Sequence, residues 1–374
     1  MSERINLYGL PRGQLEELFV SIGLQRFRAG QLMKWIYHLG ITDFSSMTDL
    51  PLVTRQWLLE HARLDLPDVV VEKKSIDGTV KWAVGVNRDE CVEMVMIPEK
   101  GRNTLCVSSQ VGCSLDCSFC ATGKQGFNGN LSAEEIVGQL LLANRYLRSS
   151  NQVVTNVVFM GMGEPLLNFE SVLAAVDIMK DDMAFGLSKR KVTISSSGVV
   201  PAIEKLSKYT DCSLAISLHA PNDDLRNTLV PINRRYPIKL LLRACQQYLQ
   251  TLGPHRKLLF EYTLIDQLND SPSQARELAD LLDEIPCKIN LIPFNDFDHS
   301  GYKTPSRSRI LGFQDVLISR GYTAMIRSTR GDDISAACGQ LAGKIKDRTQ
   351  RSRRHKEARE NPTILVSENQ RVFS

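Results

Sequence analysis

The sequence lacks the long apolar segments that a membrane protein requires. No run in its 374 residues approaches the roughly 20 consecutive apolar residues of a membrane-spanning helix. The first residues, Met-Ser-Glu-Arg-Ile-Asn, contain no apolar core of a signal peptide. Convincing internal repeats and low-complexity stretches are absent as well. We therefore expect a cytoplasmic protein without a membrane partner, long enough for one large domain and a smaller one.

Paired zinc-binding cysteines are also missing. The nine cysteines are odd in number, which favours reduced thiols over a disulfide framework. Cys113, Cys117 and Cys120 form a C-x3-C-x2-C triplet, whereas the other six are isolated and no histidine lies at ligand spacing nearby. Structural zinc usually takes four ligands in pairs. The triplet instead favours a cubane iron–sulfur cluster with one iron left open, because such clusters are normally held by four thiolates.

Charge of one sign is concentrated near the C-terminus. The chain has a formal net charge of +4, yet residues 344–359 contain eight basic and two acidic side chains. This segment alone therefore carries +6, and the rest of the chain carries −2. A basic extension on a near-neutral body favours a polyanionic partner such as RNA. The alternative is a solvated, partly disordered tail.

The hydrophobic spacing predicts two small N-terminal units. Residues 1–66 have the spacing of short helices, one of them starting after Pro51, and we interpret them as an RNA-binding accessory domain. Residues 67–98 form strands, with Asp77-Gly78 as a hairpin turn. The helical unit carries five side chains that could contact RNA if they are exposed: Arg26, Arg28, Lys34, Trp35 and Tyr37. The alternative is that Trp35 is buried in the core and the charged side chains are merely solvated.

Residues 99–345 alternate between strands and helices, and residues 346–374 form a basic tail. Ser132 and Glu135 resemble a capping box at the start of one helix. Such alternation predicts an α/β fold with a parallel sheet, open or barrel-like, in which ligands gather at the carboxyl ends of the strands. Seven strand candidates begin at Leu105, Asn156, Lys191, Ser213, Leu258, Lys288 and Thr323.

The cysteine loop, placed just after the first of these strands, resembles that of the radical S-adenosylmethionine (SAM) superfamily. Phe119 precedes the last cysteine, and an aromatic residue is usual there in that superfamily. The resemblance implies a partial (βα)6 TIM-like barrel and one [4Fe–4S] cluster on Cys113, Cys117 and Cys120. It also implies that the open iron binds SAM, which an electron cleaves to a 5′-deoxyadenosyl radical. An external electron donor is then required.

Polar residues at the strand ends match the superfamily's SAM-binding positions. Residues 160–168, Met-Gly-Met-Gly-Glu-Pro-Leu-Leu-Asn, follow the second barrel strand and resemble its Gly-Gly-Glu-like motif. On that basis Gly163 and Glu164 bind the methionyl part of SAM, although a glycine pair alone indicates only a tight turn. Ser195 ends the third strand; the remaining positions follow the fourth and sixth strands and are Ser217, Leu218, His219 and Asn295.

From about residue 5 to 350 the chain resembles one family, the RlmN-type enzymes that methylate carbon 2 of adenine in 23S rRNA and in tRNA. Two of the matching stretches are Gly-Met-Gly-Glu-Pro-Leu-Leu-Asn at 161–168 and Arg-Gly-Asp-Asp-Ile-Ser-Ala-Ala-Cys-Gly-Gln at 330–340. The resemblance implies that Cys338 accepts a methyl group from SAM, Cys106 resolves a covalent RNA adduct, and Glu93 accepts a proton. Two SAM molecules are then consumed per turnover. Structural roles remain for Cys91, Cys212, Cys245 and Cys287.

Two alternatives stay open. A Cfr-type enzyme would methylate carbon 8 instead, although Cfr-type sequences diverge from the stretch at 163–168. A non-catalytic RNA-binding or ribosome-assembly protein with a structural cluster would have no use for Cys106 and Cys338 together. The expected partners are 23S rRNA, tRNA and a reductant, and we expect a monomer.

Overall fold

The computed structural model describes residues 4–86, 90–297 and 300–341. The basic segment 344–359, on which the expected RNA partner rests, and the predicted tail at 346–374 both lie outside the described residues. Within the described part of the chain, no helix is both long and apolar enough to cross a membrane.

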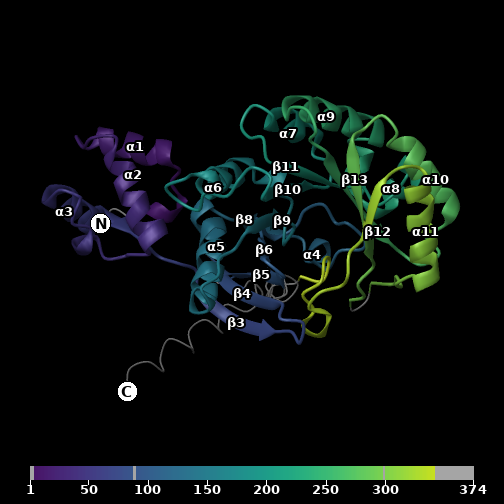
Figure 1. Cartoon of the computed structure of the whole chain (residues 1–374), viewed down its shortest axis with the longest axis horizontal. Helices are drawn as coiled ribbons and strands as arrows, with labels where there is room; N and C mark the ends of the chain where they lie inside the picture. The colour runs from purple at the N-terminus through teal and green to yellow at the C-terminus, as the bar shows by residue number, and fades with distance from the viewer. Residues whose placement is uncertain (1–3, 87–89, 298–299, 342–374) are drawn as a thin grey trace, which may run out of the picture.

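The N-terminal part is helical and stands at one side of the molecule (Figure 1). Trp35 and Tyr37 pack against its hydrophobic core, and the Tyr37 hydroxyl donates to the Tyr8 carbonyl at 3.2 Å. The two aromatics are therefore partly buried, whereas Arg26 and Lys34 are exposed. Its helices are α1 (Arg12–Ser21), α2 (Arg28–Met33), the π-helical turn η2 (Lys34–Leu39) and α3 (Leu52–His61), and its paired strands are β1 (Ile5–Asn6) and β2 (Ala62–Arg63).

A ten-stranded sheet forms the body of the molecule, in the order β14-β13-β12-β11-β10-β9-β6-β5-β4-β3. Its first seven strands are mutually parallel and coincide with the seven predicted ones, which confirms the α/β partial barrel. They are β6 (Arg102–Cys106), β9 (Asn156–Phe159), β10 (Val192–Ser196), β11 (Ser213–Ser217), β12 (Leu258–Leu264), β13 (Cys287–Pro293) and β14 (Thr323–Ile326).

Helices cover the outside of the parallel strands (Figure 1). The Ser132–Glu135 capping box at the start of α5 is present, with Glu135 accepting the Ser132 N–H at 2.8 Å. The helices after β8 (Phe127–Asn130) are α5 (Ala133–Leu147), α6 (Phe169–Lys180), α7 (Val200–Leu206), α8 (Asp223–Leu229), α9 (Ile238–Thr251), α10 (Pro272–Leu281) and α11 (Arg307–Ser319), whereas the short α4 (Ala121–Lys124) follows the cysteine loop inside the molecule.

The predicted hairpin extends the barrel sheet. Strands β3 (Val69–Lys74), β4 (Val80–Val86) and β5 (Glu90–Glu99) are antiparallel, and Gly78 in the turn has a φ of +86° that suits glycine. Strand β5 pairs with β6, Val95 opposite Cys106. The strands on either side of the predicted boundary at 98–99 therefore belong to one sheet, and the division into domains stays a prediction.

Candidate active site

Two adjoining cavities lie in the partial barrel. The larger has a volume of about 780 Å³ and is lined by residues of β5, β6 and β9 to β14, including Cys106. The smaller has a volume of about 130 Å³. Asn295 and Cys338 border both. The smaller cavity collects most of the predicted cluster and SAM positions, which are Cys113, Cys117, Cys120, Gly163, Glu164, Ser195, Ser217 and His219.

A tight strand pair holds the cysteine loop. The loop lies between β7 (Gln110–Gly112) and β8 (Phe127–Asn130), and the Cys113 N–H donates to the Gly126 carbonyl at 3.0 Å. Gly112 has a φ of +70°, and a Cβ there would lie 1.8 Å from the Gly126 oxygen. Only glycine fits at this position, so β8 can approach the chain directly beside the first cysteine.

The triplet suits a cluster better than a single ion. No three His, Cys, Asp or Glu side chains in the described part of the chain are close enough to bind one metal ion. A cubane is larger than an ion, and the cavity between the three cysteines provides space for it. Burial raises the pKa of Cys113 to about 12, and burial with the nearby Cys120 and Cys113 raises the pKa of Cys117 well above its ordinary value. Positively charged iron would offset both effects.

The Gly-Glu motif is fixed against β7. A Cβ on Gly163 would lie 2.4 Å from the Gln110 Cβ, and its φ is +95°. The buried Glu164 carboxylate accepts the N–H groups of Leu166 at 3.1 Å and Ser197 at 2.8 Å. Burial raises the pKa of Glu164, and these backbone donors oppose the shift. The carboxylate keeps further lone pairs for an ammonium group in the cavity.

The buried Arg226 of α8 joins the ends of β10 and β11. Its guanidinium donates to the carbonyl oxygens of Ser197 at 2.7 Å and Ser217 at 3.1 Å, and Nε donates to that of Leu218 at 3.0 Å. Leu218 itself borders neither cavity, because its side chain is fully buried in the main core. Of the predicted SAM positions, Leu218 therefore offers only main-chain atoms.

His219 is held as a neutral ring. Its Nδ1 accepts the Thr263 N–H at 2.9 Å, so the ring proton lies on Nε2. Burial, and secondarily the Arg226 cation, lower the pKa of His219 to about 3. Phe119 packs edge-on against the imidazole with ring centroids 4.5 Å apart. The residue before the last cysteine thus contacts a predicted SAM-binding residue.

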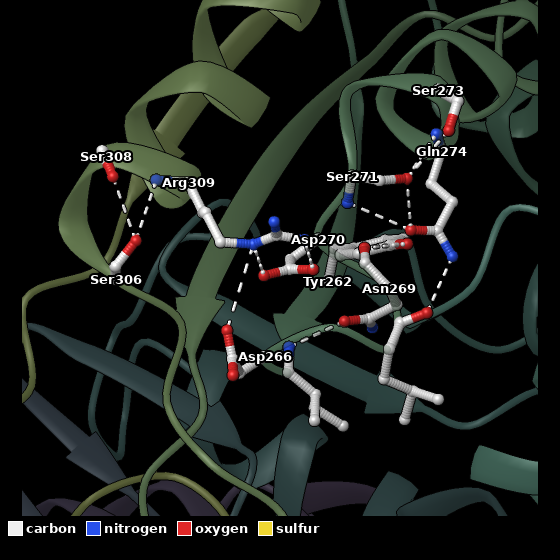
Figure 2. Close-up of polar contacts among 12 residues, drawn as sticks. Tyr262, Asp266, Asn269, Asp270, Ser271, Ser273, Gln274, Ser306, Ser308 and Arg309 are labelled. Atoms are coloured by element: carbon white, nitrogen blue, oxygen red, sulfur yellow. Dashed lines mark hydrogen bonds and ion pairs between the residues drawn. The ribbon is translucent and has the colours of Figure 1, made fainter.

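Asn269 supports His219 from the loop that follows β12. Its amide donates to the carbonyls of His219 at 2.9 Å and Thr263 at 2.7 Å, and its oxygen accepts the Ile265 N–H at 2.7 Å. Figure 2 shows this loop, where the next residue, Asp270, forms a bidentate pair with Arg309 of α11 at 2.5 Å. The ion pair holds the loop after β12 against α11, and Asn269 of that loop holds the carbonyl of His219, whose φ is +60°.

Cys106 and Cys338 share the larger cavity with a cation. Arg327 follows β14, and its Nη1 lies 3.3 Å from Glu261 Oε1. Cys338 is exposed to the cavities, yet the surrounding protein desolvates it and raises its thiol pKa, while Arg327 lowers that pKa. Burial and the nearby Cys338 raise the pKa of Cys106. Arg327 is thus placed to stabilise a thiolate on either sulfur.

Asn295 connects the two cavities. Its amide donates to the Cys338 carbonyl at 3.1 Å, and its oxygen accepts the Thr329 hydroxyl at 3.1 Å. The Ala121 N–H, next to the last cysteine of the triplet, donates to the Gly339 carbonyl at 2.8 Å. The segment around Cys338 is therefore bonded both to Asn295, a predicted SAM position, and to the cysteine loop.

Glu93 lies on β5, two residues before the partner of Cys106. Its carboxylate is 3.2 Å from the ammonium of Lys81, and both side chains are buried. Glu93 is not among the residues that line either cavity. Lys81 compensates its charge and also donates to the Ser335 carbonyl at 2.9 Å.

Five supporting residues were not predicted. Arg327 could have been found, because it is a polar residue just after a strand of a parallel sheet. The others act across the fold at positions without a motif, and no sequence signal marks them: Lys81, Arg226, Glu261 and Asn269.

Comparison with known proteins decides the family. The model described as "Ribosomal RNA large subunit methyltransferase N-terminal domain" matches residues 5–64, and "Radical SAM superfamily" matches residues 107–282. Dual-specificity RNA methyltransferase RlmN of Pseudomonas putida is 56% identical over 356 residues, covering 94% of this chain and 93% of that protein. The chain belongs to the RlmN family of radical SAM RNA methyltransferases. The RlmN of Pseudomonas entomophila matches equally, at 56% identity and 94% coverage of both chains.

A solved structure agrees with this assignment. The crystal structure of a radical SAM methyltransferase from Sphaerobacter thermophilus is 43% identical, with a TM-score of 0.84, and covers 90% of this chain and 99% of that one. This RlmN-family chain therefore has the fold of a radical SAM methyltransferase along about nine tenths of its length.

Proposed function

We propose that the chain methylates carbon 2 of one adenine in the peptidyl-transferase region of 23S rRNA and of the adenine next to the anticodon in some tRNAs. The position of Cys338 supports this most directly, because it borders both cavities while Cys106 borders the larger one. A thiol at this junction can receive a methyl group on one side and present it on the other. The 56% identity to RlmN proteins supports the choice of adenine carbon 2.

Cys113, Cys117 and Cys120 would hold a [4Fe–4S] cluster at the smaller cavity. When bound there, cluster and SAM supply a methyl group and an organic radical, with two SAM molecules used per turnover. The residues that would surround SAM are Gly163, Glu164, Ser195, Ser217, His219 and Asn295, with main-chain atoms of Leu218.

The chain's own thiols would divide one difficult step into several. Carbon 2 of adenine is electron-poor, so it does not attack a methyl donor directly. The sulfur of Cys338 accepts the methyl group as a thiolate, and the neighbouring Arg327 favours that thiolate. The S-methyl carbon would give up one hydrogen atom and bond to the base, and the adduct would lose an electron and a proton. The thiolate of Cys106 then attacks the sulfur of Cys338, the bond between that sulfur and the methyl carbon breaks, and this carbon takes up a proton as the methylated base leaves and the disulfide forms. An external reductant must then reduce the disulfide.

Glu93 would accept the proton lost from the adduct. Its carboxylate is buried and lies 3.2 Å from the Lys81 ammonium, on the strand next to the one that ends at Cys106. The target base has to leave its helix to reach the larger cavity, at a cost of a few kcal/mol, which favours RNA loops. Exposed Arg26 and Lys34 and the basic residues 344–359 would add salt-sensitive affinity for phosphates.

Nucleoside analysis tests the proposal. The protein is purified without oxygen, reconstituted with iron and sulfide, and incubated with SAM, a reductant and unmodified 23S rRNA or tRNA. Mass spectrometry should detect 2-methyladenosine in both RNAs. Formation of 8-methyladenosine would assign the chain to the Cfr-type reaction instead, and product in only one RNA would remove the other from the substrate set.

A further inference from the structure

We propose that the β3–β4 hairpin is a clasp that positions the segment carrying Cys338, with Asp77 and Lys81 as positioning residues. The clasp is defined as Ser75 to Lys81, and the clasped segment as residues 330–338. This inference rests on the proposed role of Cys338 as methyl carrier. It gives the hairpin a structural role, which the reaction proposed at the two cavities does not explain.

Asp77 forms the first contact. Its carboxylate accepts the Gly331 N–H at 3.1 Å and lies 3.9 Å from Nη1 of Arg330. Gly331 is buried with a φ of +62°, and a Cβ there would lie 3.0 Å from the Thr79 Cγ2 and 2.7 Å from the Ala336 Cβ. The turn and the segment therefore approach too closely for any larger residue.

Asp333, in the clasped segment, forms the second contact. Its carboxylate accepts the N–H of Ile76, at the tip of the hairpin, at 3.2 Å. Asp77 of the hairpin thus accepts a backbone N–H of the segment, and Asp333 of the segment accepts a backbone N–H of the hairpin. Two reciprocal bonds between one pair of short loops fix their relative orientation more firmly than either bond alone.

Lys81 forms the deepest contact. Its side chain is buried, and Nζ donates to the Ser335 carbonyl at 2.9 Å while lying 3.2 Å from the Glu93 carboxylate. Ser335 has a φ of +52°, a conformation that needs support from its surroundings. One ammonium therefore connects the proposed proton acceptor to the turn three residues before the proposed methyl carrier.

The clasped segment has little other regular structure. It contains one short 3-10 turn, η7 (Asp332–Ile334), closed by the Ala336 N–H donating to the Gly331 carbonyl at 2.9 Å. Beyond it, Asn295 holds the Cys338 carbonyl at 3.1 Å. The clasp thus holds the residues before Cys338, and Asn295 holds Cys338 itself. Loss of the clasp should leave the thiol attached but displaced from its reacting position, where a shift of about 1 Å can cost about 100-fold in rate.

The test compares Lys81→Met with Lys73→Met. Lys73 is the cross-strand partner of Lys81 on β3 and is exposed, so the same substitution is made beside the clasp without removing a clasp contact. Two quantities are measured in reconstituted full-length protein: methylated adenosine formed per 5′-deoxyadenosine released, and hydrogen exchange of residues 331–338. For Lys81→Met we expect the ratio to fall at least tenfold and the exchange to quicken at least tenfold, with Lys73→Met like wild type.

Two further variants keep the test decisive. Asp77→Asn preserves the shape of the turn and should reproduce both effects even if Lys81→Met does not fold, while Lys81→Arg should restore the ratio at least in part. An unchanged ratio and unchanged exchange in folded Lys81→Met and Asp77→Asn would overturn the clasp. The ratio is calculated with whichever methylated adenosine the wild type forms, and hydrogen exchange can be measured in inactive protein. Failure of the proposed function is therefore distinguishable from failure of the clasp.

Discussion

At the scale of single residues, the surroundings of the proposed reactive cysteines differ from those of two cysteines predicted to be structural. Cys212 and Cys245 are completely buried in the hydrophobic core. Cys106 is nearly as buried, but it borders the larger cavity, and Cys338 is exposed where the two cavities meet. The spacing of the cysteines along the chain predicts neither the burial of these thiols nor their position at the cavities. Only the family resemblance identified these two thiols in advance.

Removal of each thiol should stop the reaction at a different stage. Cys338→Ala should reduce 2-methyladenosine below detection, because the methyl group then has no sulfur acceptor. Cys106→Ala should instead accumulate RNA crosslinked to protein, visible as a slow band on a denaturing gel, because the adduct cannot be resolved. Cys245→Ala, outside both cavities, is the control and should form product without crosslinks. Product from Cys338→Ala would disprove the methyl-cysteine route.

At the scale of secondary structure, the sequence predicted the elements better than the contacts between them. The seven parallel strands, the capping box of α5 and the hairpin turn follow from local patterns, and all are present. The hydrogen bonds of Arg226 of α8 to β10 and β11 join residues up to 29 positions apart and have no local signature. Long-range contacts of this kind position the site, so its geometry could not be derived from periodicity.

Arg226→Met tests the importance of that connection. The substitution leaves the carbonyls of Ser197, Ser217 and Leu218 without the guanidinium, and each unsatisfied buried group costs about 1–3 kcal/mol. We expect the free energy of unfolding in urea to fall by about 3 kcal/mol or more. Arg243→Met on the exposed side of α9 should change it by less than about 0.5 kcal/mol. Equal effects of the two substitutions would show that Arg226 does not join the strands.

At the scale of the whole molecule, the neutral His219 makes stability depend on pH. The pKa of His219 is about 3 in the folded chain, against 6.5 for an ordinary histidine. Between these values the unfolded chain binds a proton that the folded chain does not, so stability is lost as pH falls from about 6.5 towards 3. The slope from this one group reaches about 1.4 kcal/mol per pH unit.

Urea unfolding between pH 7.5 and 5 measures this slope. His219→Asn should be less stable at pH 7.5 but should lose roughly 1 kcal/mol less per pH unit below 6.5, because asparagine does not titrate and tolerates a positive φ. His61→Gln, at an exposed position, should keep the wild-type slope. Parallel curves for wild type and His219→Asn would mean that His219 is not held neutral.

The clasp joins parts of the chain that are synthesised far apart in time. Asp77 and Lys81 each contact residues 254 positions later, and Ile76 contacts one 257 positions later. Closing so long a loop is entropically costly and depends on the sheet between the ends being already in place. The proposed methyl carrier therefore reaches its position late in biosynthesis, once nearly all of the barrel has left the ribosome. A partly made chain can fold strands and cover its core, yet the proposed methyl carrier is not in place.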